Sequence, residues 1–259
     1  MLNLDRFASV LLLLIPFSVT AQTKAPVSPV PVLVELFTSE GCSSCPSADK
    51  LLAALQSQQP VPSAHIIVLE EHVDYWDQQG WHDRFSSPQF TERQKIYAFR
   101  LKVDDPYTPE MIVDGQIQFS GNDPAKAVSA ITQAAQSPKI DLLLSKPSIE
   151  GKHLSSSVSI ASGASALPKG DLYAALITPS ASTQVKSGEN GGKHLDHVSI
   201  TRTLQHIGKL QDLNRGSISF KLSAPPDDDP AHMQLIIFAQ LPSQGAVRGL
   251  AQISAVPAS

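Results

Sequence analysis

Cysteine is almost absent from this chain: only two occur in 259 residues, and both lie in the short motif Cys42-Ser43-Ser44-Cys45. Exported proteins that rely on disulfides as structural cross-links usually carry more cysteines, spread through their loops. The sequence therefore excludes a disulfide scaffold. A lone C-x-x-C motif instead indicates dithiol chemistry at one place.

Other shortages exclude further classes. Aromatic residues make up 6% of the chain, and the formal net charge of −4 leaves no basic footprint for nucleic acid. No Ser-His-Asp order and no H-E-x-x-H zinc-protease motif occurs. The partners we expect are exported protein thiols or disulfides, or a redox partner protein. We expect no nucleic acid and no membrane span after signal cleavage.

The first 21 residues are predicted to be a signal peptide. Arg6 precedes a largely apolar stretch over 7–19, and Val19-Thr20-Ala21 forms a small-residue cleavage site. An uncleaved N-terminal anchor is the alternative, but the apolar run is short and is interrupted by Pro16. We therefore expect a periplasmic or secreted protein. Residues 22–31 are proline-rich and are expected to form an extended linker.

The segment 32–139 alternates between strand-like and helix-like patterns, with a hairpin indicated by Asp114-Gly115. The resulting order, β-α-β-α-β-β-α with the dithiol after the first strand, is the thioredoxin topology. The sequence thus predicts an α/β thioredoxin-like N-terminal domain, with strands at 32–37, 65–69, 111–113 and 116–119 and helices at 46–56, 88–101 and from 124 onward.

The pattern changes near residue 139. Short alternating runs with turns between them predict an antiparallel, β-rich, sandwich-like C-terminal domain over 140–259. The expected strands are 157–161, 172–178, 198–204, 217–222, 233–239 and 247–253.

The dithiol motif lies where a helix begins. Unpaired backbone N–H groups and the positive end of the helix dipole stabilise a thiolate there. We expect Cys42 to be the more exposed, attacking thiol and Cys45 to be the buried, resolving one. The protein then needs no cofactor besides the redox-active disulfide Cys42–Cys45. An oxidised but inert pair is the alternative.

Two further positions fit this chemistry. Thr108-Pro109 precedes the hairpin, where a cis-proline would face the dithiol, although cis X-Pro bonds are a minority state. Glu35 on the first strand is the candidate for proton transfer to the resolving thiol, because burial raises a carboxyl pKa. The alternative is that Glu35 points to solvent.

The segment after the second strand is rich in aromatic and polar residues and leaves the sheet near the dithiol. It is expected to form a rim for a substrate, or else a packed loop. Its candidate rim residues are His72, Asp74, Tyr75, Trp76 and Trp81. We predict no metal site. A Cu(I) or Zn²⁺ site at Cys42, Cys45 and His72 is the alternative, although copper carriers of this fold use a wider cysteine spacing.

A glycine-rich turn in the second half, 188–192, lacks the spacing and the following helix of a phosphate-binding loop. We expect a structural turn, in which Glu189 or Asn190 can bridge to the N-terminal domain.

Several blocks of the sequence resemble a family of secreted bacterial proteins, the domain of unknown function 1223. They are 34–49 around the C-x-x-C, His72-Val73-Asp74-Tyr75-Trp76-Asp77 with Gly80-Trp81, 90–94, Tyr107-Thr108-Pro109 with Met111, and 188–193. Lys193 and Glu71-His72 depart from the family's usual residues, but neither touches the dithiol. The resemblance implies a thioredoxin-like fold and a bacterial periplasmic or secreted location, and it implies no substrate.

Two functions therefore stay open. One is an exported thiol–disulfide oxidoreductase. The other is a non-catalytic thioredoxin-fold binding protein, either a soft-metal carrier or a partner-binding module.

Overall fold

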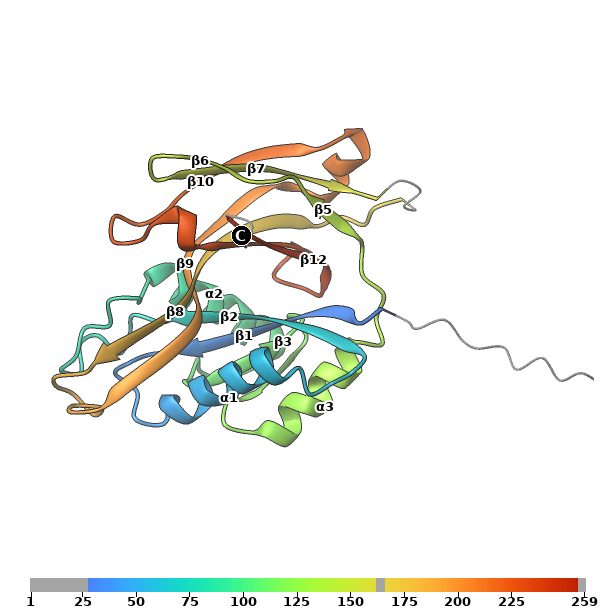
Figure 1. The fold of residues 1–259 in the computed structure, drawn as a ribbon. Coiled ribbons are helices and arrows are strands. Elements are labelled where there is room, and N and C mark those ends of the chain that lie inside the picture. Colours follow the sequence, from blue (N-terminus) through green and yellow to red (C-terminus); the bar gives the residue numbers. More distant parts are fainter. Residues whose placement is uncertain (1–27, 162–165, 256–259) are drawn as a thin grey trace, which may run out of the picture.

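The computed structural model describes residues 28–161 and 166–255 (Figure 1). The predicted signal peptide at 1–21 and most of the predicted linker at 22–31 lie outside these ranges. Within the described ranges, no helix has both the length and the apolar character needed to cross a membrane.

The first half contains the elements predicted for it, in the predicted order. A four-strand array β2-β1-β3-β4 has β1 parallel to β2 and antiparallel to β3. The elements are β1 (Val30–Thr38), α1 (Cys45–Gln58), β2 (Ala64–His72), α2 (Pro88–Leu101), β3 (Glu110–Val113), β4 (Ile117–Ser120) and α3 (Pro124–Ala134).

Local sequence signals explain where these elements begin. All three helices have proline in their first turn, where the missing N–H costs no hydrogen bond. The Asp123 side chain caps α3 by accepting from the backbone N–H of Lys126 at 2.9 Å. Between β3 and β4, Asp114 and Gly115 take φ values of 50° and 65°, which these residue types tolerate best.

The second half is built from strands whose mutual pairings are all antiparallel. All six predicted strands are present, as β7 to β12. The short β5 and β6 and two 3₁₀ helices, Leu210–Arg215 and Pro230–His232, were not predicted, because three to six residues are too few to show a periodicity. The strands are β5 (Leu142–Leu144), β6 (Ser148–Glu150), β7 (His153–Ile160), β8 (Asp171–Gln184), β9 (His194–Lys209), β10 (Ile218–Ser223), β11 (Gln234–Gln240) and β12 (Val247–Ser254).

The strands after residue 139 do not all form a sheet of their own. Four of them extend the first sheet to eight strands, in the order β12-β11-β8-β9-β2-β1-β3-β4, through a parallel pairing of Glu70 with Ile200. The remaining four form a second sheet. The reason is strand length: β8 and β9 have 14 and 16 residues and run from the second sheet down to β2 and α1 (Figure 1).

Strand β1 is buried on both faces, and this fixes which side chains meet the helices. Its even-numbered residues, Val32, Val34 and Leu36, pack in one core with α1 and α3. Leu33 and Phe37 point the other way, into a core shared with α2, β8 and β11. Neighbouring residues of β1 therefore serve different cores.

Candidate redox site

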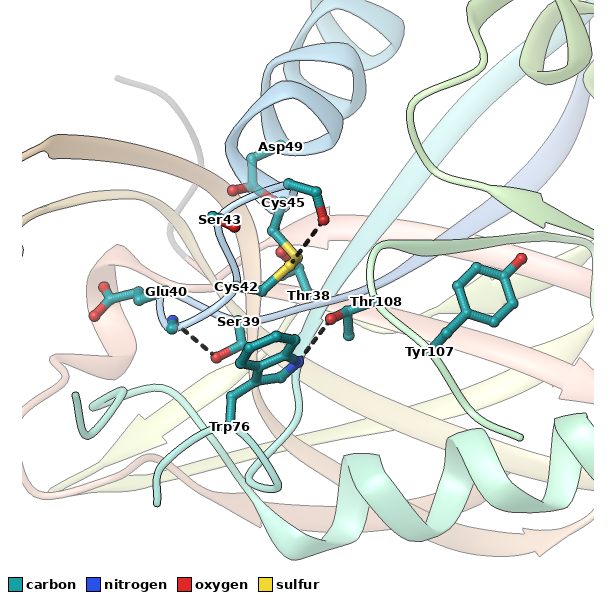
Figure 2. Close-up of a disulfide and its surroundings, with 12 residues drawn as sticks. Thr38, Ser39, Glu40, Cys42, Ser43, Cys45, Asp49, Trp76, Tyr107 and Thr108 are labelled. Atoms are coloured by element: carbon teal, nitrogen blue, oxygen red, sulfur yellow. Dashed lines mark hydrogen bonds between the residues drawn. A yellow bond between two sulfur atoms is a disulfide. The ribbon is translucent and has the colours of Figure 1, made fainter. Parts of the chain in front are cut away.

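Cys42 and Cys45 form a disulfide at the start of α1, with their Cα atoms 5.4 Å apart (Figure 2). The turn before the helix is held by the Cys42 N–H donating to the Ser39 carbonyl at 3.1 Å, and by the Cys45 N–H donating to the Cys42 carbonyl at 3.2 Å. Because Cys45 is the first residue of α1, a thiolate formed there would lie beside the free N–H groups of the first helical turn.

The predicted exposure of Cys42 is wrong. Both cysteines are 0% exposed, and only Ser43 and Ser44 between them reach solvent. The motif predicts a helix start, but it carries no information on the loop from the second half of the chain that covers this turn.

That cover is the loop between β8 and β9. The buried Asn190 amide donates to the carbonyls of Glu40 at 2.8 Å and Cys42 at 2.9 Å. Beside it, the Glu189 carboxylate accepts from the Ser43 N–H at 3.1 Å. The predicted bridge from Glu189 and Asn190 to the N-terminal half is confirmed. This loop, 185–193, binds the backbone of the disulfide turn and is called the cover below.

The Thr108–Pro109 peptide bond is cis, as predicted. Pro109 comes close to α1 at Gly121, where an added Cβ would lie 3.2 Å from the Pro109 Cβ and 3.1 Å from the Ala48 Cβ. Thr108 accepts a hydrogen bond from the Trp76 indole at 2.7 Å, and both side chains lie beside the disulfide (Figure 2).

Of the predicted rim residues, the two tryptophans lie at the disulfide turn. An added Cβ on Gly41 would lie only 3.2 Å from the Trp76 Cβ, so Trp76 packs against the turn. The Trp81 indole donates to Glu40 Oε2 at 2.7 Å. Both tryptophans are half-buried, and they flank the residues immediately before Cys42.

Two other predicted rim residues are directed to α2 instead. The Asp74 carboxylate accepts from the Thr91 hydroxyl at 2.5 Å, and the Tyr75 hydroxyl donates to the Gln94 side chain at 3.2 Å. Both contacts secure the loop after β2 to a helix on the other side of the sheet. They leave Asp74 and Tyr75 with a structural role.

Glu35 is buried but does not face Cys45. The Arg93 guanidinium donates to it at 2.8 Å from Nε, and the Tyr97 hydroxyl donates to its second oxygen at 2.7 Å. Arg93 and Tyr97 belong to α2, whereas Cys45 begins α1 on the opposite face of β1. The alternation of side chains along the strand therefore rules out the predicted proton transfer.

Asp49 is a buried carboxyl on α1, the helix that begins with Cys45, and it was not predicted. It lies one helical turn after Cys45, where residues four apart share a face, and it accepts from the Thr38 hydroxyl at 2.7 Å (Figure 2). Burial, with the nearby charge of Glu70, raises the pKa of Asp49 to about 7. A proton can therefore be taken up or released there near neutral pH.

His72 is the last predicted rim residue, and it lies in a buried polar cluster. Its Nδ1 contacts Asp83 Oδ2 at 2.6 Å, while His197 Nδ1 contacts Glu70 Oε1 at 2.7 Å. Burial opposes the charged forms of these four groups. The nearby His72 still lowers the pKa of Asp83 to about 2, and the nearby Glu70 raises the pKa of His197 to about 9.

The alternative metal set Cys42, Cys45 and His72 is not brought together. Over the described parts of the chain, the group that could hold a metal ion combines Glu70, His72 and His197, without a cysteine. No local sequence motif indicates this group, because His197 is brought to Glu70 and His72 only by the pairing of β2 with β9.

A family model described as a protein of unknown function, DUF1223, matches residues 33–240. The chain belongs to the DUF1223 family. The similarity noted in the sequence is thereby confirmed, and it spans both halves of the fold, including the cysteine turn and the covering loop.

Among solved structures, the chain is similar to a protein of Agrobacterium tumefaciens, with 23% identity and a TM-score of 0.68, covering 90% of this chain and 98% of that one. At this identity the likeness shows a shared fold. A domain of the outer membrane lipoprotein Omp28 from Porphyromonas gingivalis matches with 12% identity and a TM-score of 0.30, covering 47% and 92%. A comparison with curated proteins finds no match.

Proposed function

We propose that this DUF1223 protein is an exported thiol–disulfide exchange protein whose working group is the Cys42–Cys45 disulfide. The observation that carries the proposal is the position of this disulfide, at the first turn of α1 and in the surroundings of Thr108 and Trp76 (Figure 2). The order β2-β1-β3-β4, with α1 following β1, fits a thioredoxin-like arrangement. Export rests on the signal peptide expected at 1–21.

When the Cys42–Cys45 disulfide oxidises a partner dithiol, the reaction starts with a partner thiolate. It attacks Sγ of Cys42, a mixed disulfide forms, and the electron pair of the broken bond leaves on Sγ of Cys45. Protonated Asp49 gives its proton to that thiolate. A second partner thiolate then attacks the mixed disulfide and releases Cys42 as a thiolate, which is protonated by solvent. The partner dithiol has been oxidised, and the Cys42–Cys45 pair has been reduced.

Burial of both sulfurs adds a condition to this reaction. A partner reaches Cys42 only after the loop at 185–193 moves, since Asn190 and Glu189 bind the cysteine turn directly. Small thiols therefore react slowly, and a protein that displaces the loop reacts faster. The cover makes the exchange selective for partners that bind near Trp76 and Trp81.

The test measures redox equilibrium and mixed-disulfide formation. The purified protein is equilibrated in glutathione buffers of graded potential, and free thiols are alkylated and counted by mass spectrometry. The Cys45→Ser variant, with Cys42→Ser as the matched control, is offered to exported proteins. We expect mixed disulfides with the first variant alone and insulin reduction by the reduced wild type. A potential below about −300 mV together with no mixed disulfide would mark the bond as structural.

A further inference from the structure

A second cluster of buried polar side chains lies under the disulfide turn, and none of its members forms or breaks a bond in the proposed exchange. We propose that Glu70, His72 and His197 form a binding site for a divalent transition metal ion of the zinc type. One ligand atom from each of these residues lies within 4.8 Å of the other two. All three are buried, at 0%, 0% and 1% exposure.

The ring nitrogens converge on a single carboxylate oxygen. Glu70 Oε1 lies 2.7 Å from His197 Nδ1 and 3.5 Å from His72 Nε2. Two ligand atoms on one tetrahedral zinc ion, with bonds of about 2.1 Å, lie about 3.4 Å apart. The spacing of His72 and Glu70 already matches that value. Binding would replace the proton shared by His197 and Glu70, which leaves to solvent.

A buried atom without a partner supports a ligand at this place. His72 Nε2 has no hydrogen bond within the described residues. An unpaired buried polar atom destabilises the folded state, so such an atom calls for an explanation. A metal ion on His72 Nε2 would satisfy that atom directly.

The surrounding residues supply the outer contacts that metal-binding histidines require. His72 has its other ring nitrogen on Asp83 Oδ2 at 2.6 Å, and His197 directs its Nε2 to Glu40 Oε1 at 3.5 Å. Glu70 accepts from the Val198 N–H through its other oxygen at 2.8 Å, which turns Oε1 toward the histidines. Carboxylates behind ligating histidines fix the tautomer and increase their basicity.

The surrounding charges also suit a cation. Glu40, Glu70 and Asp83 are three buried carboxyls, and over the described ranges their salt-bridge partners are His72 and His197, with no lysine or arginine among them. A metal ion that replaces histidine protons therefore keeps the charge of this cluster balanced. Two histidines and one carboxylate form a ligand set that suits zinc and related borderline ions. Calcium and magnesium prefer sets made of oxygen atoms alone.

The experiment uses the untagged protein after treatment with a chelator. Zinc is titrated by calorimetry, metal content is counted after desalting, and Co²⁺ is added as an absorbing substitute. We expect one ion per chain and a rise in the melting temperature. His72→Gln and His197→Gln should each weaken binding by at least 100-fold, and Asp83→Asn by about 10- to 100-fold.

Two controls separate this site from other sources of binding. His194→Gln removes an exposed histidine and should leave the affinity unchanged. The Cys42→Ser/Cys45→Ser double variant lacks every thiol and should still bind one ion, so the result is independent of the exchange reaction. Failure of the folded wild type to take up one zinc ion would overturn the proposal even if the histidine variants do not fold. Equal affinity in the wild type and in a folded His72→Gln or His197→Gln variant would overturn it too.

Discussion

The most direct test of the covered disulfide is Asn190→Ala. This side chain donates two hydrogen bonds, at 2.8 and 2.9 Å, to the carbonyls of Glu40 and Cys42. A hydrogen bond contributes about 0.5–1.5 kcal/mol net, so losing both lowers the free energy of opening the loop by about 1–3 kcal/mol. If reduction occurs from the open form, its rate rises by about 5- to 150-fold.

The assay follows reduction of the disulfide by dithiothreitol, with free thiols alkylated at timed intervals and counted by mass spectrometry. Lys186→Ala, an exposed change in the same loop, is the matched control and should react at the wild-type rate. Urea unfolding of each variant shows whether global stability has changed. Equal reduction rates for Asn190→Ala and the wild type, with both folded, would refute the view that Asn190 holds the cover closed.

Two further predictions concern buried carboxyls. Asp49→Asn should slow the attack of Cys45 on a mixed disulfide by about 100-fold or more, because Asn cannot accept the thiol proton. The variant should also lose the increase in the rate of this attack as the pH rises near 7. Stopped-flow measurements from pH 5 to 9 check both effects, and a pH profile equal to that of the wild type contradicts them. Burial raises the pKa of Glu110 to about 7 from an ordinary 4.5. The folded state therefore binds more protons than the unfolded state between these values, and wild-type stability falls as pH rises through that window. Glu110→Gln should remove up to about 3 kcal/mol of this fall, measured by urea unfolding at pH 4.5 and 8; parallel pH curves for the two proteins would show that Glu110 does not titrate in the folded state.

Those parts of the fold that depend on neighbouring residues could be predicted from the sequence. Asp123-Pro124 specifies a capped helix start, and Asp114-Gly115 specifies a turn, because each acts through hydrogen bonds or dihedral angles within a few residues. The cysteine pair belongs to the same class, since a separation of three residues at a helix start brings the sulfurs together.

The orientation of Glu35 could not be predicted in this way. Strand β1 is buried on both faces, so its apolar run gives no alternation from which to assign a face. The choice is made by α2, which presents Arg93 and Tyr97 to Glu35 across 58 and 62 positions of sequence. Asp49 was missed for a different reason. An aspartate on a helix ordinarily faces solvent, but here β9 packs close to α1 and Asp49 is buried.

The same long-range packing produces both sites. The hairpin formed by β8 and β9 supplies Asn190, which covers the disulfide turn, and His197, which joins Glu70 and His72 below it. A sequence pattern cannot show this, because the pairing of Glu70 with Ile200 joins strands 130 positions apart along the chain.

Glu40 contacts both the cover over the disulfide turn and the proposed metal site. Its carbonyl accepts from Asn190, its Oε2 accepts from Trp81, and its Oε1 lies 3.5 Å from His197 Nε2. Glu40 also lies two residues before Cys42, so opening the cover to expose the disulfide moves a carboxylate that supports a histidine of the metal site. Zinc bound below should therefore hold the cover closed and slow reduction of the disulfide by small thiols. The same rate assay, run with and without one equivalent of zinc, measures that coupling, and by reciprocity the open protein must bind zinc more weakly by the same factor.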